Sequence, residues 1–198
     1  MGRGPHGERP VILDDAVLSG NLEPTMADWD AADNLTRAAV LAGLFRREGQ
    51  DWLLFTERHA DLPQHPGQIS FPGGAREGEE SPVSCALRET EEEVGLRGDC
   101  VTLLGALPTR ISTSYYRVHA LVGRFNGDVD LRPDSREVAS ILTVPLSKLM
   151  DESRWSEREY TGREGIWRSP QFFHESHEIW GLTGRLTRDL IAAIRSPG

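Results

Sequence analysis

The chain has 198 residues and a formal net charge of −9. Its length is enough for one domain with a well-buried core, and its acidic balance argues against a general nucleic-acid surface, which would carry a basic stripe. No apolar run reaches membrane-spanning length and the N-terminus lacks the apolar stretch of a signal peptide, so we expect a soluble cytoplasmic protein with no membrane partner. Two cysteines, Cys85 and Cys100, are too few for a disulfide framework, and we expect both to be reduced.

The first part of the chain predicts a tail, a hairpin and a loop. Residues 1–34 are rich in glycine, proline and aspartate, and we interpret them as a tail plus a short capping segment ahead of a domain at 35–198. Residues 38–46 and 52–56 read as two strands separated by the polar turn EGQD, which predicts a hairpin. Prolines within residues 59–67 then predict a loop.

Residues 82–94 predict a helix with well-defined ends. Ser81 can serve as its N-cap, Pro82 fits the first turn because its missing N–H is harmless there, and Gly95 supplies the C-terminal stop. At about 100° per residue, the apolar side chains form one stripe and a group of carboxylates shares a different face. These carboxylates belong to Glu89, Glu92 and Glu93.

Carboxylates at this spacing repel one another, and each like pair costs a bare helix about 0.2–0.5 kcal/mol. A bound cation relieves that cost, and oxygen ligands favour magnesium or manganese, which share their remaining positions with substrate phosphates. Arg88 can hold Glu80 or Glu92 in place beside the metal ligands. The alternative is an ordinary solvated face on which Arg88 and Glu92 form an i,i+4 pair.

Beyond this helix, the chain predicts further strands and a closing helix. Pro145 can begin a short helix ending near Met150, and the apolar spacing within residues 181–195 is typical of an amphipathic helix. The strand-like segments are 101–107, 116–125 and 138–144, with further strands of undefined bounds within 155–173.

The spacing around the acidic helix matches a known pattern. The pattern runs as a glycine, five residues, a glutamate, seven residues, Arg-Glu, an aliphatic position, one residue, Glu-Glu, one residue, a glycine and an aliphatic residue. This is the pattern of the Nudix box, and the chain therefore resembles a Nudix hydrolase. Thr90 occupies a position that is usually aliphatic; because its methyl group can face the core while its hydroxyl bonds the preceding turn, we expect a small stability cost and unchanged chemistry. The matching residues are Gly74, Glu80, Arg88, Glu89, Glu92, Glu93, Gly95 and Leu96.

A second resemblance lies just upstream and points to a subfamily. The elements LLxTxR, HxGQ and FPGG resemble the pattern that accompanies the box in coenzyme A pyrophosphatases, and residues 177–186 resemble that group's closing strand-to-helix segment. The residues that carry the upstream resemblance are Leu53, Leu54, Thr56, Arg58, His65, Gly67, Gln68, Phe71, Pro72, Gly73 and Gly74.

The order of strands and helices suggests an α+β or α/β layered domain, and the Nudix resemblance implies an α/β/α sandwich with a mixed central sheet and a loop–helix–loop box. The resemblance also implies that the Gly74 carbonyl and the carboxylates of Glu89, Glu92 and Glu93 bind Mg²⁺ or Mn²⁺. Glu89 is the candidate base inside the box. Glu137 is the best-placed glutamate outside it, with a solvated loop charge as the equal alternative.

Residues upstream of the box are expected to contact substrate. Arg58 follows a strand that leads toward the box, so we expect it to grip a phosphate, specifically the 3′-phosphate of coenzyme A; pairing with Glu57 or Asp61 is the alternative. His65 either contacts substrate or caps a turn. The expected substrate-contacting set is Arg58, His65, Gly67, Gln68, Gly73 and Gly74.

One strand departs from the subfamily pattern. The resemblance leads us to expect a proline near the end of strand 116–125, where His119 and Ala120 stand instead. If this strand lines the nucleotide pocket, the preference among nucleoside diphosphate compounds is altered.

Three functions remain open from the sequence. The first is hydrolysis of coenzyme A or its derivatives to 3′,5′-ADP and 4′-phosphopantetheine, and the second is a Nudix pyrophosphatase acting on ADP-ribose, NADH or a nucleoside triphosphate. The third is a non-catalytic ligand-sensing module, against which the intact and mutually repelling glutamates speak. In each case the partner is a small nucleotide, and the sequence leaves open whether the protein is a homodimer.

Overall fold

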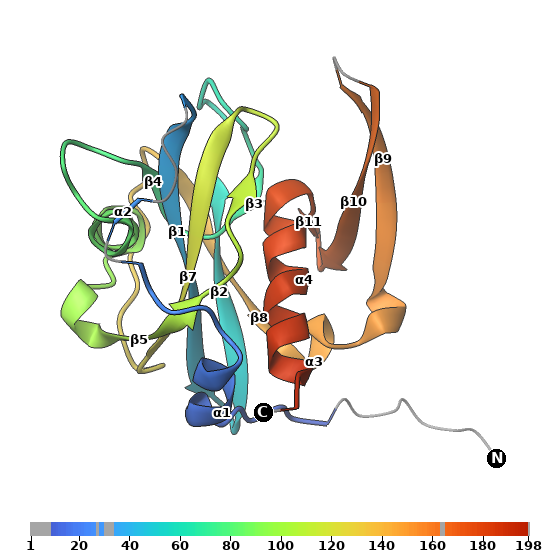
Figure 1. Ribbon diagram of the computed structural model, residues 1–198. Coiled ribbons are helices and arrows are strands. Elements are labelled where there is room, and N and C mark those ends of the chain that lie inside the picture. Colours follow the sequence, from blue (N-terminus) through green and yellow to red (C-terminus); the bar gives the residue numbers. More distant parts are fainter. Residues whose placement is uncertain (1–8, 27, 30–33, 163–164, 198) are drawn as a thin grey trace.

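The computed structural model describes residues 9–26, 28–29, 34–162 and 165–197, and it has three layers (Figure 1). Helix α2 (Pro82–Val94) covers one face of a mixed sheet, and helix α4 (Gly181–Arg195) covers the other, as the sandwich prediction requires. The shorter helices are α1 (Asp15–Gly20) and α3 (Leu146–Leu149). None of the helices in these ranges is long and apolar enough to cross a membrane.

The larger sheet has the strand order β3-β2-β1-β7-β5, with β8 also pairing β2, β4 pairing β1 and β6 pairing β7. A smaller sheet has the order β11-β10-β9 and lies on the α4 side of the molecule (Figure 1). The strands of the larger sheet are β1 (Thr36–Arg47), β2 (Gln50–Arg58), β3 (Ile69–Ser70), β4 (Gly73–Ala75), β5 (Val101–Ala106), β6 (Arg110–Ile111), β7 (Tyr116–Phe125) and β8 (Val138–Pro145). Those of the smaller sheet are β9 (Trp155–Gly162), β10 (Gly165–His174) and β11 (His177–Ile179).

Strand β1 organises the larger sheet because it changes partner along its length. It runs parallel to β7 from end to end, whereas its other edge pairs first with β4 at Ala38–Val40 and then with β2 from Leu44 onward. The short strand β4 leads into the loop before α2. This pairing therefore fixes the glycines that precede the acidic helix against the centre of the sheet.

Two apolar cores fill the spaces between the layers, and alternation along β1 separates them. Leu41 and Phe45 face α2, while Ala42 and Leu44 face the opposite helix. On the α2 side they pack with Cys85, Ala86, Val94 and Leu96, and on the α4 side with Phe55, Phe172, Leu186, Leu190 and Ile191.

The predicted hairpin is present, but its turn is tighter than EGQD. Glu48 and Gly49 alone form the turn, with φ of 53° and 74°, as two-residue hairpin connections require. Asp51 belongs to β2 and is fully buried, where its carboxylate accepts hydrogen bonds from Arg46, Arg124 and the Leu13 amide. The prediction of a four-residue polar turn was wrong because two arginines compensate the buried charge of Asp51.

The longer elements agree with their predicted bounds. Helices α2 and α4 and strand β7 begin and end at the predicted residues. The two- and three-residue strands β3, β4 and β6 were not predicted, because segments this short carry no periodicity.

The capping segment lies against the sheet. The Val11 carbonyl accepts a hydrogen bond from the Asp51 amide, Asp14 caps α1, and Leu18 is buried in the α4-side core. The predicted tail at 1–8 lies outside the described residues, and the domain boundary at 34/35 stays a prediction.

Candidate active site

The ends of α2 are held as its sequence predicts. The Ser81 hydroxyl accepts a hydrogen bond from the Ser84 amide at 3.1 Å, and Gly95 adopts the left-handed conformation with φ of 72°. Thr90 is fully buried and its hydroxyl donates to the Ala86 carbonyl at 2.6 Å, which is the arrangement expected from the sequence. These contacts fix the rotation of α2, so its carboxylates lie on a different face from its apolar stripe.

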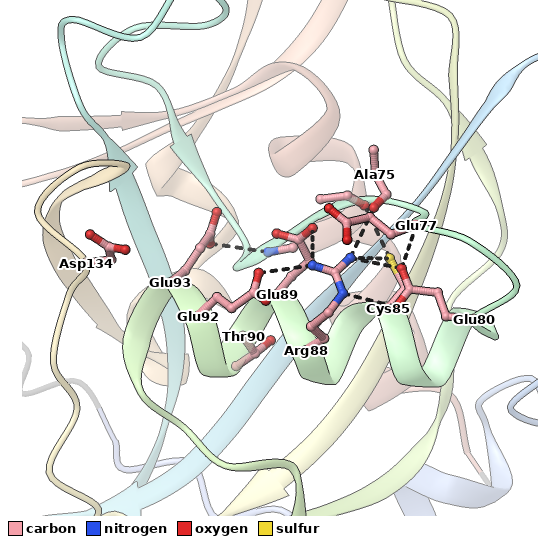
Figure 2. A network of polar contacts seen from close by, with 12 residues as sticks. Ala75, Glu77, Glu80, Cys85, Arg88, Glu89, Thr90, Glu92, Glu93 and Asp134 are labelled. Atoms are coloured by element: carbon pink, nitrogen blue, oxygen red, sulfur yellow. Dashed lines mark hydrogen bonds and ion pairs between the residues drawn. The ribbon is translucent and has the colours of Figure 1, made fainter.

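Arg88 gathers the carboxylates of this face into one network (Figure 2). Its Nε and Nη2 donate to the two oxygens of Glu80 at 3.0 and 2.9 Å, and its Nη1 donates to Glu89 Oε1 and Glu92 Oε2, each at 3.0 Å. The sequence left open whether Arg88 holds Glu80 or Glu92, and it holds both. The bidentate bond from Arg88 lowers the pKa of Glu80 to about 2, which keeps Glu80 charged at neutral pH.

Glu93 lies at the end of the network and is more deeply buried. Its side chain is 4% exposed, and its Oε2 accepts one hydrogen bond from the Gly73 amide at 3.3 Å. Burial raises the pKa of Glu93 to about 8, and burial also raises the pKa of Glu89 against the opposing effect of Arg88. The structure therefore buries acidic groups more deeply than their hydrogen bonds compensate.

Gly74 permits the close approach of the helix to β4. A Cβ at this position would lie 2.4 Å from the Glu89 carboxyl carbon, so a glycine is required for the Glu89 side chain to lie against this strand. The Gly74 carbonyl lies 3.6 Å from the Cys85 sulfur. Burial raises the pKa of Cys85 to about 12, so this thiol stays neutral and acts as a packing residue.

The donor set fits a hard divalent cation. Glu89, Glu92 and Glu93 offer carboxylate oxygens from one helix beside the backbone of Gly74, and a cation would offset the uncompensated burial of Glu93. Within the described residues, no three acidic, histidine or cysteine side chains are already gathered to hold an ion. Arg88 accounts for this, because it draws Glu89 and Glu92 toward its guanidinium; binding of a cation would exchange those contacts for metal bonds.

A pocket of about 350 Å³ opens beside β4. Most of the residues predicted to contact substrate line it, although they come from separate segments. They are Arg58, His65, Gln68, Gly73 and Gly74. Gly67 does not reach the pocket wall; with φ of 69° and its amide bonded to the Arg58 carbonyl, it forms the turn that presents His65 and Gln68.

His65 and Arg58 lie at different parts of the pocket wall. His65 Nε2 is 3.0 Å from the Ser114 hydroxyl, which joins the loop after β2 to the loop after β6. Arg58 donates to the Gln64 carbonyl, while Glu57 pairs with Ser140 and Asp61 with His59. The charge of Arg58 opposes the rise in the pKa of Glu93, and Arg58 lines the same pocket as Gly73 and Gly74.

Glu137 is exposed and follows the loop that packs beside the end of α2. Its carbonyl accepts a hydrogen bond from the His59 amide, and its charge contributes to the raised pKa of both Glu89 and Glu93. The charge of Glu137 therefore acts on the carboxylates of the acidic face, and its role as a base stays a prediction.

The pocket also has a wall that the sequence did not reveal. Tyr160 of β9, Trp180 before α4 and Arg185 within α4 line it together with Ile111 and Tyr116. Their separation along the chain gives no local pattern. His119 and Ala120, which depart from the subfamily pattern, are buried in the core, and Val118 is the nearest residue of β7 that lines the pocket.

Comparisons with known proteins point to one family. The NUDIX domain model matches residues 35–163. A protein of Escherichia coli (strain K12) named as an uncharacterized Nudix hydrolase, NudL, is 34% identical over 187 residues, covering 94% of this chain and 96% of its own. A protein of the same name from Enterobacter sp. (strain 638) is 34% identical over 165 residues, covering 81% and 84%.

Solved structures confirm the fold. A MutT/nudix family protein from Enterococcus faecalis superposes with a TM-score of 0.52 at 16% identity, covering 84% of this chain and 63% of its own. The Nudix hydrolase RenU from M. smegmatis gives a TM-score of 0.50 at 21% identity, covering 59% and 74%.

Proposed function

The chain belongs to the Nudix hydrolase family, and from this premise we propose that it hydrolyses a phosphoanhydride bond in a nucleoside diphosphate derivative, with coenzyme A or its derivatives as the substrate. The products would be 3′,5′-ADP and 4′-phosphopantetheine. One observation carries the choice of substrate. Six of the eleven residues that resemble the coenzyme A pyrophosphatase pattern line one pocket, beside the acidic face of α2: Arg58, His65, Gln68, Phe71, Gly73 and Gly74.

Glu89, Glu92, Glu93 and the Gly74 carbonyl would hold Mg²⁺ or Mn²⁺ in this proposal. The cation would neutralise charge on the diphosphate and polarise its phosphorus. The protein positions an attacking water and takes its proton: the water oxygen bonds to phosphorus, the bridging P–O bond breaks, and the leaving phosphate keeps the electron pair. Glu89 is the first candidate to accept the proton, since burial raises its pKa toward the range of a useful base. Glu137 is the second candidate.

Arg58 would contact a phosphate of the substrate. Because Arg58 lines the pocket together with Gly73 and Gly74, which precede the acidic helix, we assign it to the scissile diphosphate in place of the 3′-phosphate that the sequence suggested. A planar guanidinium can bind either phosphate group, so the two assignments are distinguished by their effects on kcat/KM and not by the type of contact.

The test is a substrate comparison with magnesium, using coenzyme A, dephospho-coenzyme A, ADP-ribose, NADH and dGTP. We expect coenzyme A to have the highest kcat/KM, and dephospho-coenzyme A to be about 10-fold or more poorer because a charged partner of the 3′-phosphate is left unpaired. Higher turnover of ADP-ribose than of either would overturn the coenzyme A assignment. Absence of hydrolysis of all five compounds would support a ligand-sensing module.

Arg58→Ala separates the two assignments of that arginine. If Arg58 contacts the scissile diphosphate, the variant loses kcat/KM equally on coenzyme A and dephospho-coenzyme A. If it contacts the 3′-phosphate, the variant narrows the difference between the two substrates and leaves dephospho-coenzyme A unchanged.

A further inference from the structure

The pocket wall contributed by the C-terminal part of the chain is aromatic and rigid. Tyr160 and Trp180 meet edge to face, with ring centroids 5.5 Å apart and an interplanar angle of 79°. The Arg158 guanidinium lies 4.4 Å from the centroid of the Trp180 ring, and its Nη1 donates to Glu178 at 2.6 Å. Contacts with Tyr160 and Arg158 therefore hold the indole in place, and both Tyr160 and Trp180 line the pocket.

A cation accompanies these rings. Arg185 lies one turn into α4 and lines the same pocket. One of its N–H groups donates to the Arg168 carbonyl of β10 at 3.3 Å, which anchors the side chain without neutralising it. Arg185 is thus a positive charge on the wall of the pocket that the two aromatic rings also line, and it comes from a different element than Arg58.

The size of the pocket restricts its occupant. About 350 Å³ is near the lower limit for ligand pockets, so it can hold one end of a coenzyme A molecule and not the whole. A flexible pantetheine chain would lose rotamer freedom on entering it, whereas a purine base is already planar and rigid. Base-to-aromatic contacts depend on the π-face that every base has, and fixed aromatic rings provide them at little entropic cost.

We propose that Tyr160 and Trp180 bind the adenine base of the substrate and that Arg185 binds the 3′-phosphate on its ribose. This inference rests on the proposed function in taking as the ligand an adenine nucleotide with a 3′-phosphate on its ribose. It assigns specificity to residues outside the box and leaves Arg58 for the diphosphate.

The experiment measures binding of adenine-containing and adenine-free product fragments to the full chain by calorimetry with magnesium. The ligands are AMP, 3′,5′-ADP and 4′-phosphopantetheine, and the variants are Trp180→Ala, Tyr160→Ala and Arg185→Gln. We expect Trp180→Ala to weaken AMP and 3′,5′-ADP about 5- to 100-fold. Binding of 4′-phosphopantetheine should change less than about 2-fold, because it lacks the base.

Trp167→Ala is the matched control. Trp167 pairs with Tyr160 across β9 and β10, but its side chain is on the exposed part of the hairpin and does not line the pocket. This variant should bind all three ligands as the wild type does. Equal weakening by Trp167→Ala and Trp180→Ala would overturn the assignment, because the effect would then belong to the hairpin as a whole.

Arg185→Gln tests the second half of the proposal. It should reduce the preference for 3′,5′-ADP over AMP about 10-fold and leave AMP itself unchanged. If the variant keeps the wild-type preference for 3′,5′-ADP over AMP, Arg185 does not bind the ribose 3′-phosphate. Should Trp180→Ala fail to fold, Tyr160→Ala carries the same expectation for the base.

The outcomes distinguish this inference from the proposed function. If adenine nucleotides bind through Trp180 but coenzyme A is not hydrolysed, the coenzyme A assignment fails and the base site stands. If coenzyme A is hydrolysed and Trp180→Ala weakens only 4′-phosphopantetheine, the pocket holds the other arm and the base site fails. Failure of the wild type to bind AMP or 3′,5′-ADP also overturns it.

Discussion

Helix α2 and the C-terminal segment from β9 to α4 both contribute to the candidate site, but they are built in different ways. In α2 the functional side chains follow one another on a single helix, and Arg88 joins Glu80, Glu89 and Glu92 directly. In the C-terminal segment, Tyr160 and Trp180 come from different elements and meet only because β9, β10 and β11 pair. The candidate metal-binding residues are thus close together in the sequence, whereas the residues of the pocket wall are brought together by tertiary structure.

The two regions also differ in charge. The α2 face is acidic and partly desolvated, so its stability depends on what neutralises it. The C-terminal wall is aromatic with arginines, so it holds its shape without a ligand. Changes in α2 should therefore affect turnover of every substrate, and changes in the C-terminal wall should affect the choice among substrates.

The largest expected effect is the loss of a metal ligand in α2. Glu93→Gln and Glu92→Gln should each lower kcat at least about 100-fold, since even the outer partners of metal ligands are worth about 10- to 100-fold. The loss should be the same for coenzyme A and ADP-ribose. Steady-state rates with both substrates, together with Tm, provide the measurement.

Glu91→Gln is the control for this prediction because Glu91 lies on the same helix and is exposed to solvent. It should retain wild-type activity. Stability of the Glu93 variant should not fall, because the substitution removes a buried acid whose burial is uncompensated. A Glu92 or Glu93 variant with wild-type turnover would exclude that residue from the metal site.

Two adjacent glycines should separate activity from stability. In Gly74→Ala the new Cβ meets only the flexible end of Glu89, so this carboxylate is displaced and kcat should fall about 10- to 100-fold with little change in Tm. In Gly73→Ala the Cβ would lie 2.4 Å from the Ala39 carbonyl oxygen, at a φ of 151° that disfavours alanine. This variant should lose about 2 kcal/mol or more of stability.

Thermal melts and initial rates of the two glycine variants are sufficient. An active Gly74→Ala protein would mean that Glu89 works from a different position than the one described. A Gly73→Ala protein as stable as the wild type would mean that β4 can move away from β1.

The comparison also explains what the sequence could predict. Ser81, Pro82 and Gly95 define the ends of α2 by local rules, and 3.6-residue periodicity places the carboxylates on one face. The same rules explain why the bounds of β7 and α4 were correct. The box, the fold class and the buried position of Thr90 could all be predicted from short-range patterns.

Features that depend on long-range contacts could not be predicted. Asp51 looked like a turn residue because nothing in the sequence shows that Arg46 and Arg124 are its ion-pair partners. No local sequence pattern marked Tyr160 and Trp180 as pocket residues, because they too are brought together by long-range contacts. The depth of Glu93 also depends on β4, a three-residue strand with no periodicity of its own.

Metal binding should depend on pH through Glu93. Its pKa is about 8 in the folded protein and about 4.5 when unfolded, so between these values the folded state holds a proton that the unfolded state has lost. Metal-free protein should therefore lose stability as pH rises through this interval, by at most about 1.4 kcal/mol per pH unit. Magnesium competes with the proton, so its stabilising effect should grow over the same interval.

Tm measured from pH 5 to 9, with EDTA or with magnesium, tests this directly. The gain from magnesium should be small near pH 5 and largest near pH 9. Glu93→Gln should flatten the pH dependence of the metal-free protein. A gain that is independent of pH would show that Glu93 does not exchange a proton for the cation.

The smallest expected effect tests whether a core-facing residue of α2 contributes to turnover or only to packing. Thr90 lies between Glu89 and Glu92 in sequence, but it is buried and its hydroxyl bonds the Ala86 carbonyl within the helix. Thr90→Val keeps the shape, adds apolar surface to the core and removes a bond that slightly disfavours the helix, so stability should rise by less than about 1 kcal/mol. Turnover should not change, because Thr90 faces the apolar core while Glu89, Glu92 and Glu93 lie on a different face of the helix. A loss of kcat above about 10-fold with an unchanged Tm would mean that the Thr90 hydroxyl sets the rotation of the acidic face. Thr90 would then position the carboxylates for the reaction as well as pack in the core.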